Sequence, residues 1–223
     1  MRTFEDLYAW AAERKGGSDA LEGLFDPVKS PKALAAIPDD RWLSDMTRRV
    51  FQAGFNWSVI DNKWEGFEAA FDGFDPGRWT LMSDADLDRL VTDTRIVRHA
   101  AKIQSVRDNA IFIARLAKDH GSAGRFFGQH PKTDYVGLLD TLKKQACRMG
   151  GTTAQYFLRG MGVDSVIFTR DVAAALVREG VVDKAPTSKK DLAAAQHAFN
   201  VWMEESGRPL GHISRVLAFT VGD

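Results

Sequence analysis

Cysteine is nearly absent from this 223-residue chain, which contains only Cys147. A single cysteine cannot form an internal disulfide, so the sequence excludes a disulfide framework and favours a reducing compartment. The five histidines are scattered and show no spacing typical of a metal site. We therefore expect no bound metal and no cofactor.

Long apolar runs are missing as well. No stretch approaches the roughly 20 residues that a membrane-spanning helix needs, and the first residues, MRTFEDLYAWAAERKGG, lack the apolar centre of a secretory signal. We expect a cytoplasmic protein with no membrane partner. The 30 basic residues balance the 30 acidic residues, which argues against a general nucleic-acid coat protein but permits a local basic face.

Strand signals are also missing, because neither Asn-Gly turns nor sustained period-two alternation occurs. Apolar residues instead recur at helical spacing, as at Leu43, Met46 and Val50. The sequence predicts an all-α protein of about nine or ten helices. The segment from Gly16 to Pro38, rich in Gly and Pro, is expected to form a loosely structured approach to the core.

Aromatic residues are concentrated between residues 42 and 74. Three of them recur at helical spacing and are expected in the core: Trp64, Phe67 and Phe71. Gly54 interrupts the helix before Phe55 and Trp57, which places these two rings in or near a turn. There an aromatic ring can stack on a base or fill a gap between bases; the pattern fits a packing anchor for the loop equally well.

A basic stripe follows, with Arg95, Arg98, His99 and Lys102 at intervals that place them on one face of a helix. Such a stripe can bind phosphates, and Lys102 is our candidate phosphate-binding residue within it. A solvated surface is the alternative.

Two glycines and two threonines separate the helical segments DYVGLLDTLKKQACRM and TTAQYFLRGMG. This pattern is typical of a helix–hairpin–helix motif, whose hairpin amides and second helix N-terminus hold one DNA phosphate without reading sequence. A side chain on the hairpin would keep the phosphate at a distance. We expect the phosphate site at four residues: Gly150, Gly151, Thr152 and Thr153. A tight helix–helix turn with no ligand is the alternative.

Three motifs occur in order between residues 54 and 110: GFNW, FEAAFDGFDP and DADLDRLVTDTRIVRHAAKIQSVRDNA. In order and spacing they resemble the 3-methyladenine DNA glycosylase I family, which shows Gly-aromatic-or-Leu-x-Trp, F-x-x-x-F-x-x-F-D-P and I-I-R-x-x-x-K-I-x-x-x-x-x-N-A. A looser resemblance continues through MGGTTAQYFLRGMG, where the family has a Gly-Pro-Thr hairpin and F-M-Q-A-x-G.

The resemblance implies an all-α helix–hairpin–helix DNA glycosylase with two helical lobes and a cleft between them. It implies a divergent N-terminal segment over residues 1–40 and a glycosylase-like domain over 41–223, with the hairpin near 147–155. We expect a monomer that acts on double-stranded DNA containing an alkylated base. The family's structural zinc should be absent, because its cysteine and histidine ligands are missing.

The resemblance also suggests roles for individual residues in flipping a base out of the duplex. Phe55, with Gln52 alongside, would be the wedge that fills the gap left in the DNA. Trp57 would be a wall of the base pocket, with Trp42 also assigned to this pocket. Arg49 occupies the position of the family's pocket glutamate, where its charge would repel a cationic 3-methyladenine nucleoside.

Two carboxylates are alternative catalytic groups. Asp45 lies one helical turn before Arg49. Asp171 lies 17 residues after Ala154, and many helix–hairpin–helix glycosylases carry an essential aspartate shortly after the second helix; the cap of the following helix is its other interpretation. Two functions therefore stay open: a glycosylase, favoured by the wedge and Trp57, or a non-catalytic protein that binds damaged or distorted duplex, favoured by Arg49.

Overall fold

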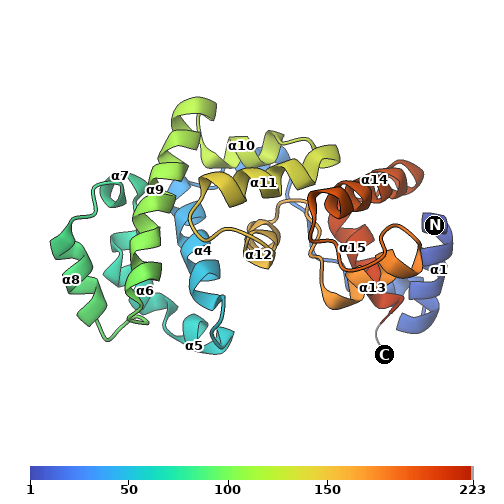
Figure 1. Ribbon diagram of the computed structural model, residues 1–223, viewed down its shortest axis with the longest axis horizontal. Helices are drawn as coiled ribbons and strands as arrows, with labels where there is room; N and C mark the ends of the chain where they lie inside the picture. Colours follow the sequence, from blue (N-terminus) through green and yellow to red (C-terminus); the bar gives the residue numbers. More distant parts are fainter. Residues whose placement is uncertain (222–223) are drawn as a thin grey trace. The chain divides into compact units, whose positions relative to one another are not determined.

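The computed structural model describes residues 1–221, and all regular secondary structure in that range is helical (Figure 1). The all-α prediction is confirmed. The predicted number of helices is wrong, because the described range holds fifteen α-helices and two 3-10 turns. Six of the α-helices have only four to seven residues, too short for a periodic pattern to appear. None of the helices in residues 1–221 is both long and apolar enough to span a membrane.

The chain forms two compact units, each assembled from separate stretches of sequence. Unit 2 consists of residues 29–130 and 139–161, and unit 1 contains the remaining stretches. Because these units interleave along the chain, they do not follow the order of the predicted segments 1–40 and 41–223. The boundary near residue 40 stays a prediction.

Unit 2 is built around a long central helix, α9, which packs against α4, α7, α8 and α10. Helix α4 also contacts α12. The elements of unit 2 are α3 (Pro31–Ala35), α4 (Asp39–Gln52), α5 (Trp57–Asn62), α6 (Trp64–Ala70), η1 (Asp72–Phe74), α7 (Pro76–Trp79), α8 (Asp84–Thr92), α9 (Ala100–His120), α10 (Ala123–Gln129), most of α11 (Tyr135–Gln145) and α12 (Thr152–Met161).

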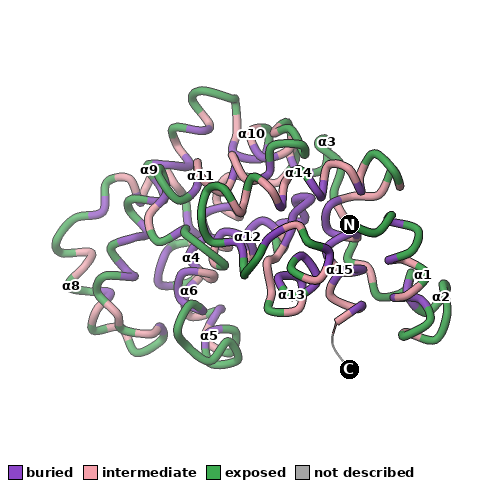
Figure 2. The backbone as a smooth tube through the Cα atoms, turned by 45° about the vertical axis from the view of Figure 1, so that its right-hand side comes forward, coloured by how far each residue is buried: buried purple, intermediate pink, exposed green. Residues whose placement is uncertain are grey.

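An aromatic cluster forms the core between α4 and α6. Trp64, Phe67 and Phe71 are buried as predicted. The ring of Phe67 meets that of Phe51 on α4 at 4.7 Å. Figure 2 shows the resulting contrast: α4 is largely buried, whereas α5 is mostly exposed. The turn that contains Phe55 therefore begins where α4 leaves the core, and it ends at Trp57, the first residue of α5.

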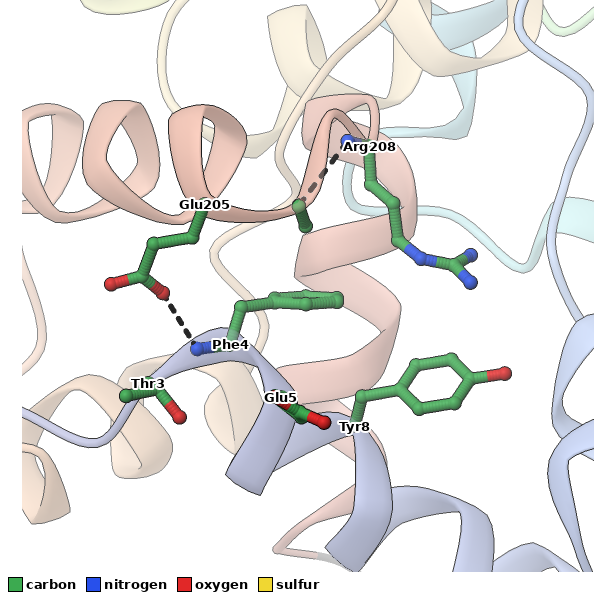
Figure 3. Close-up of a pocket in the computed structure, with 7 residues that line it drawn as sticks. Thr3, Phe4, Glu5, Tyr8, Glu205 and Arg208 are labelled. Atoms are coloured by element: carbon green, nitrogen blue, oxygen red, sulfur yellow. Dashed lines mark hydrogen bonds between the residues drawn. The ribbon is translucent and has the colours of Figure 1, made fainter.

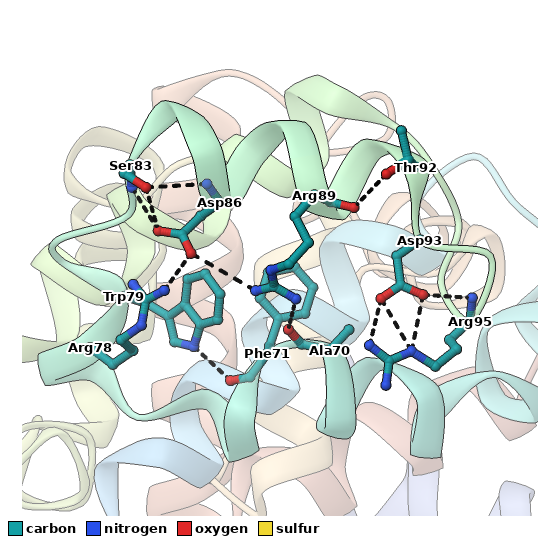
Figure 4. Close-up of polar contacts among 10 residues, drawn as sticks. All are labelled: Ala70, Phe71, Arg78, Trp79, Ser83, Asp86, Arg89, Thr92, Asp93 and Arg95. Carbon is teal, nitrogen blue, oxygen red and sulfur yellow. Dashed lines mark hydrogen bonds and ion pairs between the residues drawn. The ribbon is translucent and has the colours of Figure 1, made fainter.

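The motif segment around α8 has structural contacts of its own (Figure 4). Ser83 and Asp86 cap the start of α8 reciprocally, and Asp86 also accepts from the Arg78 guanidinium. These contacts hold the pKa of the Asp86 carboxyl far below its usual range, with the Arg78 bond as the main cause. Arg95 pairs with Asp93 at 2.7 Å. These contacts therefore stabilise the chain segments that lead into α9.

Unit 1 contains α1 (Phe4–Lys15), α2 (Ser18–Glu22), η2 (Lys132–Asp134), α13 (Arg170–Arg178), α14 (Lys189–Ser206) and α15 (Leu210–Phe219), together with the first residues of α11. A hollow of about 500 Å³ lies at the N-terminus of α1 (Figure 3). Glu205 accepts there from the Phe4 backbone N–H at 2.7 Å. The Arg208 guanidinium pairs with Glu22 at 2.6 Å and covers the Tyr8 ring. These contacts join α1 and α2 to α14 and the residues that follow it within unit 1.

The expectation of a loosely structured segment from Gly16 to Pro38 is wrong, because the segment contains α2 and α3. Each has five residues, which is too short for an apolar period. Ser30 caps α3, and Pro31 occupies its first turn, a position that proline favours. Gly124 of α10 packs so closely on α3 that a Cβ would lie 2.1 Å from the Leu34 carbonyl oxygen.

Candidate functional site

The hairpin between α11 and α12 is fixed to α9 by one buried side chain. The Asn109 side-chain amide donates to the Cys147 carbonyl at 3.2 Å and accepts from the Cys147 N–H at 2.8 Å. Arg148 adds a bond from its Nε to the Ala101 carbonyl at 3.3 Å. The predicted helix–hairpin–helix arrangement is present, since α11 ends at Gln145 and α12 begins at Thr152.

Two residues of this hairpin lie in the left-handed backbone region, Arg148 and Gly151, each with φ of 59°. Glycine adopts this conformation at no steric cost, whereas arginine is strained by it. Gly150 has an ordinary φ, and a Cβ on it would meet only Lys143 at 3.8 Å. The outer side of the hairpin at Gly150 is therefore open to a ligand.

A pocket of about 210 Å³ opens next to the hairpin. The side chains of Phe55 and Trp57 are 41% and 42% exposed, and the Trp57 ring meets Tyr156 of α12 edge-on at 4.9 Å. The lining residues come from the end of α4, the following turn and the start of α12: Arg49, Gln52, Ala53, Gly54, Phe55, Trp57, Thr152, Thr153 and Tyr156. The structure thus brings together the predicted wedge, pocket wall and phosphate-binding threonines.

Tyr156 was not among the residues selected from the sequence. Its position, one helical turn after Thr152, was the available signal, because residues four apart share a helix face. Only the fold shows that this face meets Trp57.

Arg49 is the charged group in the pocket wall. Its Nε and Nη2 donate to the two Asp45 carboxylate oxygens at 3.2 and 3.3 Å, and its Nη1 donates to Gln52 Oε1 at 3.1 Å. Burial raises the pKa of the Asp45 carboxyl, and the neighbouring guanidinium of Arg49 opposes that rise. The Asp45 carboxylate therefore partly neutralises the positive charge of Arg49.

Two predicted residues do not fit their assigned roles. Gln52 is only 3% exposed, and its amide is held by Arg49 and by Asp61 at 3.0 Å. It is not free to insert into DNA beside Phe55. Trp42 is fully buried, with its ring stacked on Phe127 at 4.7 Å, so it is a core residue and not a lining residue of this pocket.

The predicted basic stripe is also wrong as a helical face. Helix α9 begins only at Ala100, with His99 as its N-cap, so Arg95 and Arg98 precede the helix. Lys102 is 6% exposed, and its Nζ donates to the Phe51 and Ala53 carbonyls at 3.1 and 2.6 Å. Burial lowers the pKa of the Lys102 ammonium, and nearby Arg148 adds to this. Lys102 thus caps the end of α4, a geometry that does not fit phosphate binding.

Asp171 lies in the first turn of α13, in unit 1. The residue that caps α13 is Thr169, whose side chain accepts from the Val172 N–H at 3.2 Å. The alternative interpretation of Asp171 as that cap is therefore wrong. Among residues 1–221, no three His, Cys, Asp or Glu side chains are grouped so that they could hold a metal ion.

Comparison with solved structures shows which class of protein has this fold. A crystal structure of 3-methyladenine DNA glycosylase I is similar at a TM-score of 0.50 and 26% identity, covering 66% of this chain and 87% of that one. The 8-oxoguanine glycosylase/lyase of Methanocaldococcus jannaschii, solved in complex with DNA, has a TM-score of 0.55 at 13% identity and covers 96% of both chains. At that identity the likeness shows the fold alone. The chain has the all-α fold of DNA glycosylases.

A family model for methyladenine glycosylases matches residues 38–145. DNA-3-methyladenine glycosylase 1 of Escherichia coli (strain K12) is 42% identical over 59 residues, and the DNA-3-methyladenine glycosylase of Haemophilus influenzae is 34% identical over 59 residues. Each alignment covers 26% of this chain and 32% of the relative, so the match spans about a third of these relatives' length. This match of residues 38–145 to the methyladenine glycosylase model confirms the resemblance found in the sequence.

The role of Asn109 in fixing the hairpin can be tested by Asn109→Ala. The change leaves the buried Cys147 N–H and carbonyl without their partner, so unfolding free energy should fall by about 1–3 kcal/mol. Urea unfolding measures the loss, and hydrogen exchange should become faster at the Cys147 amide. Arg115→Ala is the control, because it removes an exposed bond from α9 to Gln145 at the end of α11. Equal stability of the two variants would contradict the anchoring role.

Proposed function

We propose that this protein is a DNA glycosylase that hydrolyses the bond between an alkylated base and its deoxyribose. Such a reaction is the first step of base-excision repair. The resemblance points to bases of the 3-methyladenine type. The observation that carries the proposal is one pocket lined both by the exposed rings of Phe55 and Trp57 and by Thr152 and Thr153 at the start of α12.

This combination suits base flipping. The glycosidic bond of a stacked base is out of reach, so the nucleotide must rotate out of the duplex into a pocket. The hairpin amides around Gly150 and Gly151 would hold a backbone phosphate. Phe55 would fill the gap in the stack, and the flipped base would lie against Trp57. Stacking on an aromatic ring contributes about 1–3 kcal/mol per base.

The catalytic carboxylate has two candidates, each to be tested separately. Asp45 adjoins the pocket through Arg49, but both its oxygens already accept from that guanidinium. Asp171 lies in the first turn of α13, which Thr169 caps. Either would stabilise the positive charge that develops on the sugar and assist the attacking water.

A second function, binding without catalysis, is favoured by Arg49. A guanidinium in the pocket wall disfavours a cationic alkylated nucleoside, and the chain has no other charged side chain among the pocket-lining residues. Incubation of the pure protein with methylated duplex separates the two functions. A glycosylase releases free base and leaves abasic sites. A binding protein retards the duplex in a gel and releases no base.

The hairpin can be tested at Gly150 without disturbing the fold, because the space around it is open. Gly150→Ala and Gly150→Leu should leave thermal stability nearly unchanged. Affinity should fall progressively with side-chain size, and equally for damaged and undamaged duplexes, because a phosphate carries no sequence information. The slope of the logarithm of the binding constant against the logarithm of the salt concentration should decrease by about one, as expected for the loss of one phosphate contact. A folded Gly150→Leu variant that binds duplex as tightly as wild type would show that the hairpin does not hold DNA.

The pocket wall can be tested by Trp57→Ala. Base release from methylated duplex should fall by about fivefold to 150-fold in single-turnover experiments, since stacking contributes about 1–3 kcal/mol. Affinity for undamaged duplex should change little. Val59→Ala is the matched control, because Val59 is equally exposed on α5 but does not line the pocket. Unchanged release by the Trp57 variant would remove Trp57 from the site.

The carboxylates are separated by Asp45→Asn and Asp171→Asn. The variant that lacks the catalytic group should lose single-turnover rate while its affinity for DNA is retained, because the carboxylate acts in the transition state. The other variant should cut like wild type. If both variants retain the full rate, neither carboxylate is catalytic.

A further inference from the structure

Lys102 extends from α9 to the turn that follows α4. Its side chain is buried, and its Nζ donates to the carbonyls of Phe51 and Ala53 at 3.1 and 2.6 Å. An ammonium group has three N–H donors and no acceptor, and the partial negative charge at a helix C-terminus favours a cation there. Lys102 therefore fixes the backbone at Ala53, which lines the pocket together with Gly54 and Phe55.

The same ammonium also contacts two aromatic rings. Its Nζ lies over the Phe55 ring, 4.6 Å from the centroid, and 5.8 Å from the centroid of the Phe51 ring. A cation within about 6 Å of a ring centroid is attracted to the face of that ring. Phe51 is fully buried whereas Phe55 is 41% exposed. Lys102 therefore connects the exposed ring at the pocket to a ring of the core.

The backbone between α4 and Phe55 is restrained on its own account as well. The Phe55 N–H donates to the Gln52 carbonyl at 3.1 Å. Gly54 has a φ of 78°, in the left-handed region that glycine adopts at no steric cost. With the two bonds from Lys102, the carbonyls of residues 51 to 53 all have partners. The direction in which Phe55 leaves α4 is therefore determined before DNA is bound.

We propose that Lys102 is the positioning residue of the DNA wedge, holding the turn and the ring of Phe55 in the orientation that fills the gap left by a flipped base. This inference rests on the proposed function and assigns a residue to one of its steps. A side chain that is already held in place loses less conformational freedom when it inserts between base pairs. Because Lys102 is buried, it acts through Phe55 and not by touching DNA.

A duplex with a built-in gap tests the wedge separately from the chemistry. A tetrahydrofuran abasic-site analogue lacks the base, so the ratio of its affinity to that of undamaged duplex measures how well the gap is filled. Wild type should prefer the abasic duplex. Lys102→Met keeps a long unbranched side chain but removes the charge and the donors, so this preference should fall about twofold to thirtyfold, the range of a cation–π contact.

The matched control is Lys63→Met. The Lys63 Nζ donates to the Thr94 carbonyl at 2.9 Å, so this change also removes a bond from a lysine to the backbone of unit 2. Lys63 does not line the pocket, and the preference for the abasic duplex should be unchanged. If Lys102→Met does not fold, Lys102→Gln replaces it, because glutamine keeps an N–H donor for a carbonyl but carries no charge.

Two further measurements separate positioning from other roles. Phe55→Ala should lose the preference by itself, and Lys102→Met added to it should change the preference little, because no wedge is left to position. The slope of the logarithm of the binding constant against the logarithm of the salt concentration, measured with undamaged duplex, should be the same for Lys102→Met and wild type. A decrease of this slope by about one would show that Lys102 binds a phosphate instead and would overturn the inference.

The remaining outcomes distinguish this inference from the proposed function. Release of base from methylated duplex is measured in parallel with the full chain. If wild type releases base but has no preference for the abasic duplex, or if Lys102→Met retains the preference or lowers it equally with and without the Phe55 ring, the inference is overturned and the glycosylase stays. If no base is released but the preference depends on Lys102 through Phe55, the inference is supported and the protein only binds.

Discussion

The two hydrogen bonds between Asn109 and the Cys147 backbone determine where the hairpin lies in unit 2. They attach the hairpin to α9, the longest helix of the described chain. Helix α9 also packs on α4, so the start of α12 and the end of α4 are positioned by the same helix. The pocket between them follows from this arrangement. A hairpin that moved away from α9 would separate Thr152 and Tyr156 from Trp57.

Charges near the pocket are paired within unit 2. Lys102 donates to the last carbonyls of α4, where a cation is favourable because the helix C-terminus carries partial negative charge. Arg49 is paired with Asp45 on the same helix. Buried charges need such partners to offset their desolvation. Arg49 is therefore a paired charge in the wall of the pocket.

Helical periodicity and motif order were sufficient to predict the fold class, the hairpin and the exposed turn with Phe55 and Trp57. Short helices such as α2 and α3 were not predicted, because five residues contain little more than one helical turn. The basic stripe failed because spacing alone does not show where a helix begins. Trp42 and Gln52 failed because a resemblance to a family does not show whether a side chain is buried or already hydrogen-bonded: Trp42 is fully buried, and the Gln52 amide is held by Arg49 and Asp61. The contact between Arg49 and Gly160 joins distant parts of the chain, so only the fold reveals it.

The central claim is that one site holds a phosphate at the hairpin and a flipped base at Trp57. NMR spectra of the isotope-labelled protein with duplexes test it directly. The amides of residues 150–153 should shift with damaged and undamaged duplex alike, whereas the Trp57 indole N–H should shift only with a duplex that contains the alkylated base. Indole shifts of equal size with both duplexes, or no shift at the hairpin amides, would contradict the account.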